Sequence, residues 1–528
     1  MPPADPAERS PVSARFRRVA AREALYAIVV AALAASANLL AFLDRNRADI
    51  DEPGRVVRWA VVAAIAAAAC VVVGIVALPR VAAPAVGAVV ASAAFLLLCW
   101  SWFDVGPLAV QYTLWIAGTA AVAALARLAM RTANGRVFVL VLVGALAALP
   151  AVSFVRWDAT ARAAASDEPV MRPTPLRPPV RPDLPSIFVF VLDGYGRADQ
   201  LRRVTGYDNA PMDDALARRG FTVDERAFSP YPVTWLSIAS LLDMDHVAHT
   251  SADVAAGRSR FVDRLRGNNA FVRTVRALGY GYVHAESGTY DGSRCTELVD
   301  VCIPARTDDA GVALDELEFA SLQLTPLRPL LDRGTLPLAD TATAPGRVVD
   351  ALPAARAELG EHPLAVFAHV VSPHAPYRYE ADCTHRRRNV AGLGTGWDDD
   401  LTDEYTEQLQ CLNRQLLDAI DRIVADDPDA IIVLTGDHGP AFTVDFTAPL
   451  AEWSDDQRAE RFAVFHASRL PDRCRPAVPQ SGSLVDALRV VTACVAGTEP
   501  TPVDPRAFLY RYDHDTLEEL DDLSPLTE

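Results

Sequence analysis

The chain contains 528 residues, 51% of them hydrophobic, and carries a formal net charge of −17. It has no lysine. Residues 1–157 contain 14 Arg against 8 Asp and Glu, a net charge of +6. The remainder contains 36 Arg against 59 Asp and Glu, a net charge of −23. So acidic a C-terminal part argues against a nucleic-acid partner, whose phosphates it would repel.

The first 157 residues are predicted to form a multi-pass membrane domain. Apolar stretches close to the ~20 residues that a bilayer-spanning helix needs occur at about 24–43, 59–79, 81–102, 108–126 and 137–155. A cleaved signal peptide is the alternative for the first stretch, but four more follow and no small-residue cleavage site closes it. An odd number of spans, about five, places the two ends of this domain on opposite sides of the membrane.

Arginine sets the expected orientation, because cytoplasmic loops carry an excess of basic residues. One side of the five-span arrangement carries Arg9, Arg15, Arg17, Arg18, Arg22, Arg80, Arg127, Arg131 and Arg136. The other side carries fewer, namely Arg45, Arg47, Arg55, Arg58 and Arg156, together with the acidic residues Asp44, Asp49, Asp51, Glu52 and Asp104. We therefore expect a cytoplasmic N-terminus and a cell-membrane protein whose remaining domains are extracytoplasmic.

Cysteine usage fits an oxidising compartment, since all but two of the cysteines follow Trp157. Cys70 and Cys99 lie inside apolar stretches. The other six can pair in many ways, and closeness in sequence favours the pairs Cys295–Cys302, Cys383–Cys411 and Cys474–Cys494. A structural zinc site is the competing interpretation, but no Cys-x-x-Cys pair is present.

The part after Trp157 divides into a linker, a folded domain and a tail. Residues 158–185 are rich in proline and read as an extended spacer. Beyond them, predicted strands at about 187–192, 364–371, 430–435 and 461–466 alternate with predicted helices at about 209–219, 403–425 and 483–496. This alternation predicts an α/β domain with a largely parallel sheet at 186–510, followed by an acidic C-terminal tail at 511–528.

Two of these strands end in polar side chains. The run 431–435 leads into Asp437 and His438, and the run 187–192 leads into Asp193. Consecutive strand residues point to opposite faces, so Asp437 and His438 share one ion only if the backbone turns there, which flanking glycines permit. Since ligands collect outside the carboxyl ends of strands in open α/β sheets, we expect one site. Asp193-Gly194 as an ordinary turn is the alternative.

Two further segments carry candidate functional residues. The segment 229–240 places the hydroxyls of Thr234 and Ser237 after a proline-rich turn, and the segment 371–377 places His374 just beyond a strand. On local sequence alone, Thr234 and Ser237 are equally suited to capping a helix. His374 is equally suited to an ordinary loop.

Taken together, the segments Leu192-Asp193-Gly194-Tyr195, 231–244, Pro373-His374-Ala375-Pro376-Tyr377 and Asp437-His438-Gly439-Pro440 resemble the alkaline phosphatase and sulfatase superfamily. The similarity is greatest to its membrane-anchored branch, which contains lipoteichoic acid synthases and phosphoethanolamine transferases, and it runs from about Pro185 to Tyr510. It implies an alkaline phosphatase-like domain.

The resemblance also implies roles for single residues. Asp193, Thr234, Asp437 and His438 would hold a divalent cation, with Thr234 also the nucleophile, and His374 would contact the substrate phosphate. Sulfatases proper need a Cys/Ser-x-Pro-x-Arg motif, which is absent around Thr234, so sulfate ester hydrolysis is not expected. Carboxylates and one imidazole suit Zn²⁺ or Mn²⁺, with Mg²⁺ as a further candidate.

The expected function is metal-dependent transfer of a phosphate-linked head group through a phosphothreonine intermediate. The donor would be a membrane lipid, and the acceptor an envelope glycan or lipid. Coordination to a dication would activate the threonine hydroxyl, which is a poor nucleophile at neutral pH. The alternatives are a phosphodiesterase or phosphatase that uses water as acceptor, and a catalytically silent envelope protein.

Overall fold

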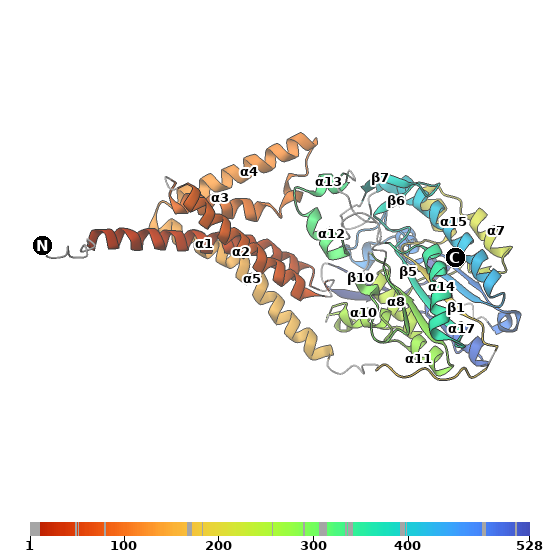
Figure 1. Cartoon of the computed structure of the whole chain (residues 1–528). Helices are drawn as coiled ribbons and strands as arrows, with labels where there is room; N and C mark the ends of the chain where they lie inside the picture. The colour runs from red at the N-terminus through yellow and green to blue at the C-terminus, as the bar shows by residue number, and fades with distance from the viewer. Residues whose placement is uncertain are drawn as a thin grey trace. The chain divides into compact units, whose positions relative to one another are not determined.

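The structure is a computed structural model, and it describes residues 11–527 apart from 48–49, 51, 79–80, 166–171, 182, 256, 289–290, 306–313, 333–334, 336–341, 391–396, 398, 478–481 and 513–514. Of the charged residues used above for orientation, Arg9, Asp49, Asp51 and Arg80 lie outside the described residues. The chain forms two compact units (Figure 1). The apolar unit comprises Met1–Thr160 and Phe319–Pro329, and the globular unit comprises Ala161–Glu318 and Leu330–Glu528.

The apolar unit contains the five helices that the sequence predicts. They are α1 (Pro11–Arg45), α2 (Pro53–Ala77), α3 (Ala83–Leu96), α4 (Leu108–Ala129) and α5 (Ala133–Ala165). By length and composition, four of them are able to cross a membrane: α1 from Ala21 onward, α2, α4 and α5 up to Ala161. The third has only 14 residues, because the chain leaves the helix after Leu96 and enters the 3-10 segment Trp100–Phe103. The five predicted apolar helices are therefore present, and the third is shorter than the predicted stretch 81–102.

The globular unit is built on a seven-stranded sheet in the order β2-β9-β8-β1-β5-β3-β4. The strands are β1 (Ile187–Leu192), β2 (Thr222–Val223), β3 (Gly281–Ala285), β4 (Val301–Ile303), β5 (Leu364–Val370), β8 (Ile431–Gly436) and β9 (His466–Arg469). From β8 to β4 all neighbours are parallel, and β9 runs antiparallel to both β8 and β2. The central strands are buried along their whole length, as parallel strands covered on both faces are. The predicted α/β class with a largely parallel sheet is confirmed.

Helices cover both faces of this sheet (Figure 1). Alternate residues of β1 point to opposite faces, so Ile187, Val189 and Val191 join one core, while Phe188, Phe190 and Leu192 join the other. The first core is covered by α8 (Thr234–Asp243), α10 (Ser259–Leu265), α11 (Ala270–Ala277) and α17 (Ala487–Ala496). The second is covered by α6 (Ala198–Thr205), α7 (Ala210–Ala217), α14 (Pro345–Leu359) and α15 (Thr402–Asp426).

The other α-helices and strands are α9 (Ser251–Val254), α12 (Glu316–Gln323), α13 (Arg328–Asp332), β6 (Tyr377–Tyr379), β7 (His385–Val390), α16 (Asp455–Phe462), β10 (Phe508–Arg511), β11 (Thr516–Glu519) and α18 (Ser524–Thr527). β6 pairs with β7 and β10 with β11, both antiparallel. The three disulfides are Cys295–Cys302, Cys383–Cys411 and Cys474–Cys494, so the predicted pairing is confirmed.

Two predicted segments need correction. The predicted strand at 461–466 is wrong: α16 occupies the residues up to Phe462, and β9 begins at His466. A capping box formed by Ser454 and Gln457 starts that helix, and the apolar run 462–465 at its end resembles a strand in sequence. The predicted tail at 511–528 is part of the fold, because β10 and β11 form a hairpin across its boundary and Leu520 and Leu526 are buried.

Candidate metal centre

Three buried side chains meet at the carboxyl edge of the sheet: Asp193, Asp437 and His438. One potential ligand atom from each lies within 4.8 Å of the others. Asp193 follows β1 and Asp437 follows β8, and the parallel register pairs Leu192 with Gly436. The next residues along both strands therefore emerge side by side, and the two strand ends face one site as the sequence indicates.

Gly436 and Gly439, which flank Asp437 and His438, are needed because other backbone segments pass close to them. A Cβ atom on Gly436 would lie 2.3 Å from the carbonyl oxygen of Tyr195, and one on Gly439 would lie 1.9 Å from that of Glu460. Neither glycine is among those with positive φ. These two positions therefore need glycine because a side chain has no room there, and not for the conformational freedom expected from the sequence.

The two carboxylates are poorly satisfied by the protein alone. Asp437 Oδ1 accepts hydrogen bonds from the backbone N–H groups of Gly194 (3.0 Å) and His438 (2.9 Å). Asp437 Oδ2 and Asp193 Oδ1 are buried and accept no hydrogen bond from the described residues. Each lies within 3.5 Å of His438 Nε2. Buried anionic oxygens in this state are costly, and a bound cation would offset that cost.

The electrostatics of the three side chains also favour cation binding. Burial and the neighbouring Asp193 carboxylate raise the pKa of Asp437. Burial acts to raise the pKa of Asp193 as well, but the imidazoles of His374, His369 and His438 outweigh it and the pKa is lowered. Burial, followed by the charge of Arg461, lowers the pKa of His438, which favours the neutral imidazole that metals bind. Two carboxylates and a neutral imidazole are a donor set that fits a divalent cation.

Thr234 completes the group. It is the first residue of α8, and its Oγ1 atom lies 3.2 Å from His438 Nε2. The N-terminal turn of a helix has N–H groups without intrahelical partners, which favours a nearby anion. Thr234 is also partly exposed, unlike the three buried residues.

The hydroxyls of Thr234 and Ser237 do not cap a helix, which was the alternative role considered for them. The residue at the cap position is Val233, and it makes no side-chain cap hydrogen bond. The hydroxyl of Ser237 instead donates to the backbone carbonyl of Asp437 (2.5 Å) and contacts Ser229 Oγ at 2.7 Å. Ser237 therefore supports the chain that carries Asp437.

His374 lies beside the cluster rather than inside it. Its backbone N–H donates to the carbonyl of Asp193 (3.0 Å), and its ring centroid lies 6.3 Å from that of His438. Its Nδ1 atom lies 2.7 Å from the carbonyl oxygen of Ala375, which can only accept, so Nδ1 carries the proton. The ring is partly exposed, and Trp397 packs edge-on against it with centroids 5.0 Å apart.

One functional candidate escaped the sequence analysis. His369 lies in β5, is fully buried, and places Nε2 3.4 Å from Asp193 Oδ2. The register pairs it with Val191, two residues before Asp193. A histidine within the otherwise apolar strand 364–370 is a signal that could have been recognised.

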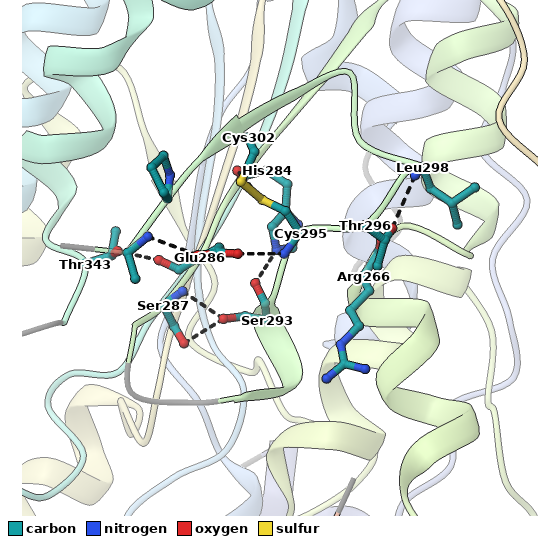
Figure 2. Close-up of a disulfide and its surroundings, with 12 residues drawn as sticks. Arg266, His284, Glu286, Ser287, Ser293, Cys295, Thr296, Leu298, Cys302 and Thr343 are labelled. Carbon is teal, nitrogen blue, oxygen red and sulfur yellow. Dashed lines mark hydrogen bonds between the residues drawn. A yellow bond between two sulfur atoms is a disulfide. The ribbon is translucent and has the colours of Figure 1, made fainter. Parts of the chain in front are cut away.

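The described residues include one other group with metal-ligand spacing, formed by Glu286, Cys295 and Cys302. Figure 2 shows Glu286 beside the Cys295–Cys302 disulfide. Its carboxylate accepts the backbone N–H groups of Cys295 (2.9 Å) and Ala305 (3.1 Å). Both sulfurs are committed to the disulfide and the carboxylate to the backbone, so this group is structural.

No family model and no curated protein matches this chain, but solved structures match its fold. Lipooligosaccharide phosphoethanolamine transferase A from Neisseria meningitidis, an integral membrane protein, is 12% identical, with 89% of this chain and 95% of that chain covered and a TM-score of 0.41. The C-terminal periplasmic domain of EptC from Escherichia coli, in complex with Zn, is 12% identical, with 67% and 99% covered and a TM-score of 0.41. A putative sulfatase from Bacteroides fragilis is 12% identical, with 66% and 84% covered and a TM-score of 0.37.

The chain is thus structurally similar to phosphoethanolamine transferases and sulfatases, in agreement with the resemblance of its motifs to the alkaline phosphatase and sulfatase superfamily. The similarity concerns the fold alone. Because the TM-scores are below 0.5 and the identities low, these matches say nothing about activity, metal or substrate in this chain.

Proposed function

We propose that the globular unit is a metal-dependent phosphotransferase that moves a phosphate-linked head group from a membrane lipid to an envelope acceptor. The observation that carries this proposal is the Thr234 hydroxyl, which lies 3.2 Å from His438 Nε2 at the edge of the buried Asp193–Asp437–His438 cluster. An accessible hydroxyl beside a cation-binding cluster is the arrangement that nucleophilic catalysis by threonine needs.

Asp193, Thr234, Asp437 and His438 would hold one divalent cation. Three oxygen donors and one imidazole suit Zn²⁺ or Mn²⁺, with Mg²⁺ as a third candidate. When bound, such a cation supplies a lower pKa for the coordinated hydroxyl and offsets charge on the phosphoryl oxygens. The unpaired oxygens of Asp193 and Asp437 support this assignment.

The transfer needs two displacements at phosphorus. In the first, Thr234 Oγ1 forms a bond to the donor phosphorus, the bond from phosphorus to the lipid oxygen breaks, and the proton given up by Thr234 ends on the departing lipid alcohol. His374 lies at the exposed side of the cluster, where its ring is placed to hydrogen-bond the phosphoryl group or to pass that proton. In the second, an acceptor hydroxyl forms a bond to the same phosphorus, the bond from phosphorus to Thr234 Oγ1 breaks, and the proton given up by the acceptor returns to Thr234.

The location of the protein follows from different observations. Four helices of the apolar unit are long and apolar enough to span a membrane, which would keep the site near its lipid donor. Three disulfides in the globular unit support an oxidising, extracytoplasmic compartment. The arginine distribution supports a cytoplasmic N-terminus. Residues 1–157 would be the membrane domain, 158–185 the linker and the remainder the catalytic domain.

The test is an assay of the purified full chain, loaded with Zn²⁺ or Mn²⁺, on vesicles of phosphatidylethanolamine or phosphatidylglycerol labelled in the head group. Label recovered on an added glycan or glycolipid acceptor supports the proposal. Label released only as a water-soluble product identifies a phosphodiesterase. Thr234→Ala is the control, because it removes the proposed nucleophile, which is also one of the proposed cation ligands. A purified chain that binds no cation and leaves every lipid intact would favour a binding or assembly role.

A further inference from the structure

Arg461 is a buried arginine next to the candidate metal centre. It lies in the last turn of α16 and is 3% exposed. Its Nε atom donates a hydrogen bond to the backbone carbonyl of Pro232 (2.8 Å), and its Nη1 atom donates one to the carbonyl of Gly439 (2.7 Å). A further bond runs from Nη2 to Pro232. One guanidinium therefore joins two segments that are 207 positions apart in the chain, 232 and 439.

Both carbonyls belong to functional segments. Pro232 comes two residues before Thr234, and Gly439 directly follows His438. The carbonyl of Gly439 also accepts from His438 Nδ1 (3.1 Å), which leaves Nε2 to face Thr234 Oγ1. Arg461 thus contacts the backbone on both sides of the 3.2 Å approach between the nucleophile and a metal ligand.

The guanidinium of Arg461 packs among aromatic rings. Among the described residues, no carboxylate oxygen lies within ion-pair distance of the guanidinium, which instead faces the rings of Trp397 (5.9 Å) and Phe446 (4.8 Å). A buried charge without a carboxylate partner is expensive, and an apolar side chain of similar size would pack there at lower cost. What only arginine provides is a planar fork with several donors in fixed geometry.

We propose that Arg461 is a positioning residue that holds the Thr234 segment and the His438 segment in register, so that the Thr234 hydroxyl reaches the cation held by Asp193, Asp437 and His438. This inference rests on the proposed function. A purely structural brace would affect only the stability of the fold. A positioning residue must also change cation affinity through Thr234, because partners of metal ligands commonly alter affinity or activity by about 10- to 100-fold.

The test compares Arg461→Met with Arg276→Met in the full chain. Arg276 is a matched control: its side chain is 11% exposed, it pairs with Asp300 (2.9 Å), and it donates to the carbonyl of Leu298 (3.2 Å). It lies at the opposite edge of the sheet, since Asp300 accepts from the N–H of Tyr282 near the start of β3. Zn²⁺ affinity is measured by competition with a chromogenic chelator, and stability by thermal melting.

We expect Arg461→Met to weaken Zn²⁺ binding by about tenfold relative to Arg276→Met, and to lower kcat by about 10- to 100-fold with little change in KM. In a Thr234→Ala background the loss of affinity should shrink to about threefold or less, because the ligand that Arg461 positions is already absent. Arg461→Lys, which keeps the charge without the fork, should fall between wild type and Met. If Arg461→Met fails to melt cooperatively, the comparison is made with Arg461→Lys.

Equal Zn²⁺ affinity in Arg461→Met and Arg276→Met would overturn the inference, as would a loss that is unchanged in the Thr234→Ala background. Wild-type behaviour of Arg461→Lys would overturn it where Met does not fold. A wild-type chain that binds Zn²⁺ but transfers no head group contradicts the proposed function alone, and the affinity comparison then still decides the role of Arg461.

Discussion

Thr234 Oγ1 lies 3.2 Å from His438 Nε2, although 204 positions separate the two residues in the chain. Thr234 begins α8, which packs on one face of the sheet, whereas His438 follows the central strand β8. Side-chain hydrogen bonds to backbone carbonyls connect the two segments: Ser237 donates to the carbonyl of Asp437, and Arg461 donates to those of Pro232 and Gly439.

Substitution of Thr234 should separate chemistry from folding. We predict that Thr234→Ala lowers kcat by about 1,000-fold or more, because the attacking oxygen and one cation donor are lost together. Thr234→Ser should keep part of the activity, since the hydroxyl remains while the methyl group that restricts its rotamer is lost. Head-group transfer to an acceptor is the measurement.

Ser237→Ala is the control for that series. The buried hydroxyl of Ser237 donates a hydrogen bond to the backbone carbonyl of Asp437. We therefore expect Ser237→Ala to lower activity by about tenfold, within the range for partners of metal ligands. A Ser237→Ala variant that is inactive beside a nearly wild-type Thr234→Ala would show that the nucleophile has been assigned to the wrong hydroxyl.

Cation binding should depend on the buried carboxylates and not on the second cluster. We predict that Asp193→Asn and Asp437→Asn each weaken Zn²⁺ binding by about 100-fold or more, because each removes a charged ligand. Glu286→Gln should leave the affinity unchanged, since Glu286 accepts backbone N–H groups and its cysteine neighbours are oxidised. Metal analysis of dialysed protein measures all three. Retention of a full equivalent of metal in Asp437→Asn would exclude this cluster as the site.

The positions of these acidic residues were predictable because β1 and β8 are continuous apolar runs whose ends carry polar residues. Parallel strands place such ends at one edge, so Asp193 and Asp437 could be assigned to one site from sequence. A histidine within the apolar strand 364–370 is visible in the sequence, but the closeness of His369 to Asp193 is not, because it depends on the register between β1 and β5, which no local pattern encodes.

The burial of Arg461 could not be predicted from the sequence either. Residues 461–466 read as a strand because they are largely apolar, whereas the capping box at Ser454 and Gln457 commits the preceding residues to α16. The helix turns Arg461 inward toward Pro232 and Gly439. Only tertiary structure reveals that a charged residue in this run is buried.

The stability of the globular unit should depend on pH through Asp213. Burial, then the charges of Asp214, Glu225 and Asp208, raise its pKa from 3.8 to about 6. Because the folded state binds this proton more tightly, the stabilising contribution of Asp213 is fully present below pH ~4 and is lost as the pH rises through about 6.

Asp213→Asn should therefore increase the free energy of unfolding at pH 8, by about 1 kcal/mol once the partial exposure of the side chain is allowed for. It should have almost no effect near pH 4. Denaturant titrations of variant and wild type at the two pH values test this, and an equal effect at both would contradict it.

Membrane orientation can be tested with reporter fusions at the two ends of α5. A reporter that is active only outside the cytoplasm should work when fused after Ala165, where α5 ends, and fail when fused after Arg131, just before it begins. The arginine excess on the Arg131 side is the reason. Activity at Arg131 with silence at Ala165 would place the catalytic site in the cytoplasm.

The central claim is that Thr234 carries the head group in covalent form, and intact-protein and peptide mass spectrometry test it most directly. The cation-loaded full chain is incubated with a head-group-labelled lipid in the absence of acceptor, quenched in acid and digested. The account predicts a phosphodiester-linked head group on Thr234, lost on addition of acceptor and absent from Thr234→Ala. Turnover of the lipid with Thr234 unmodified at every time point, or the label on another residue, would contradict it.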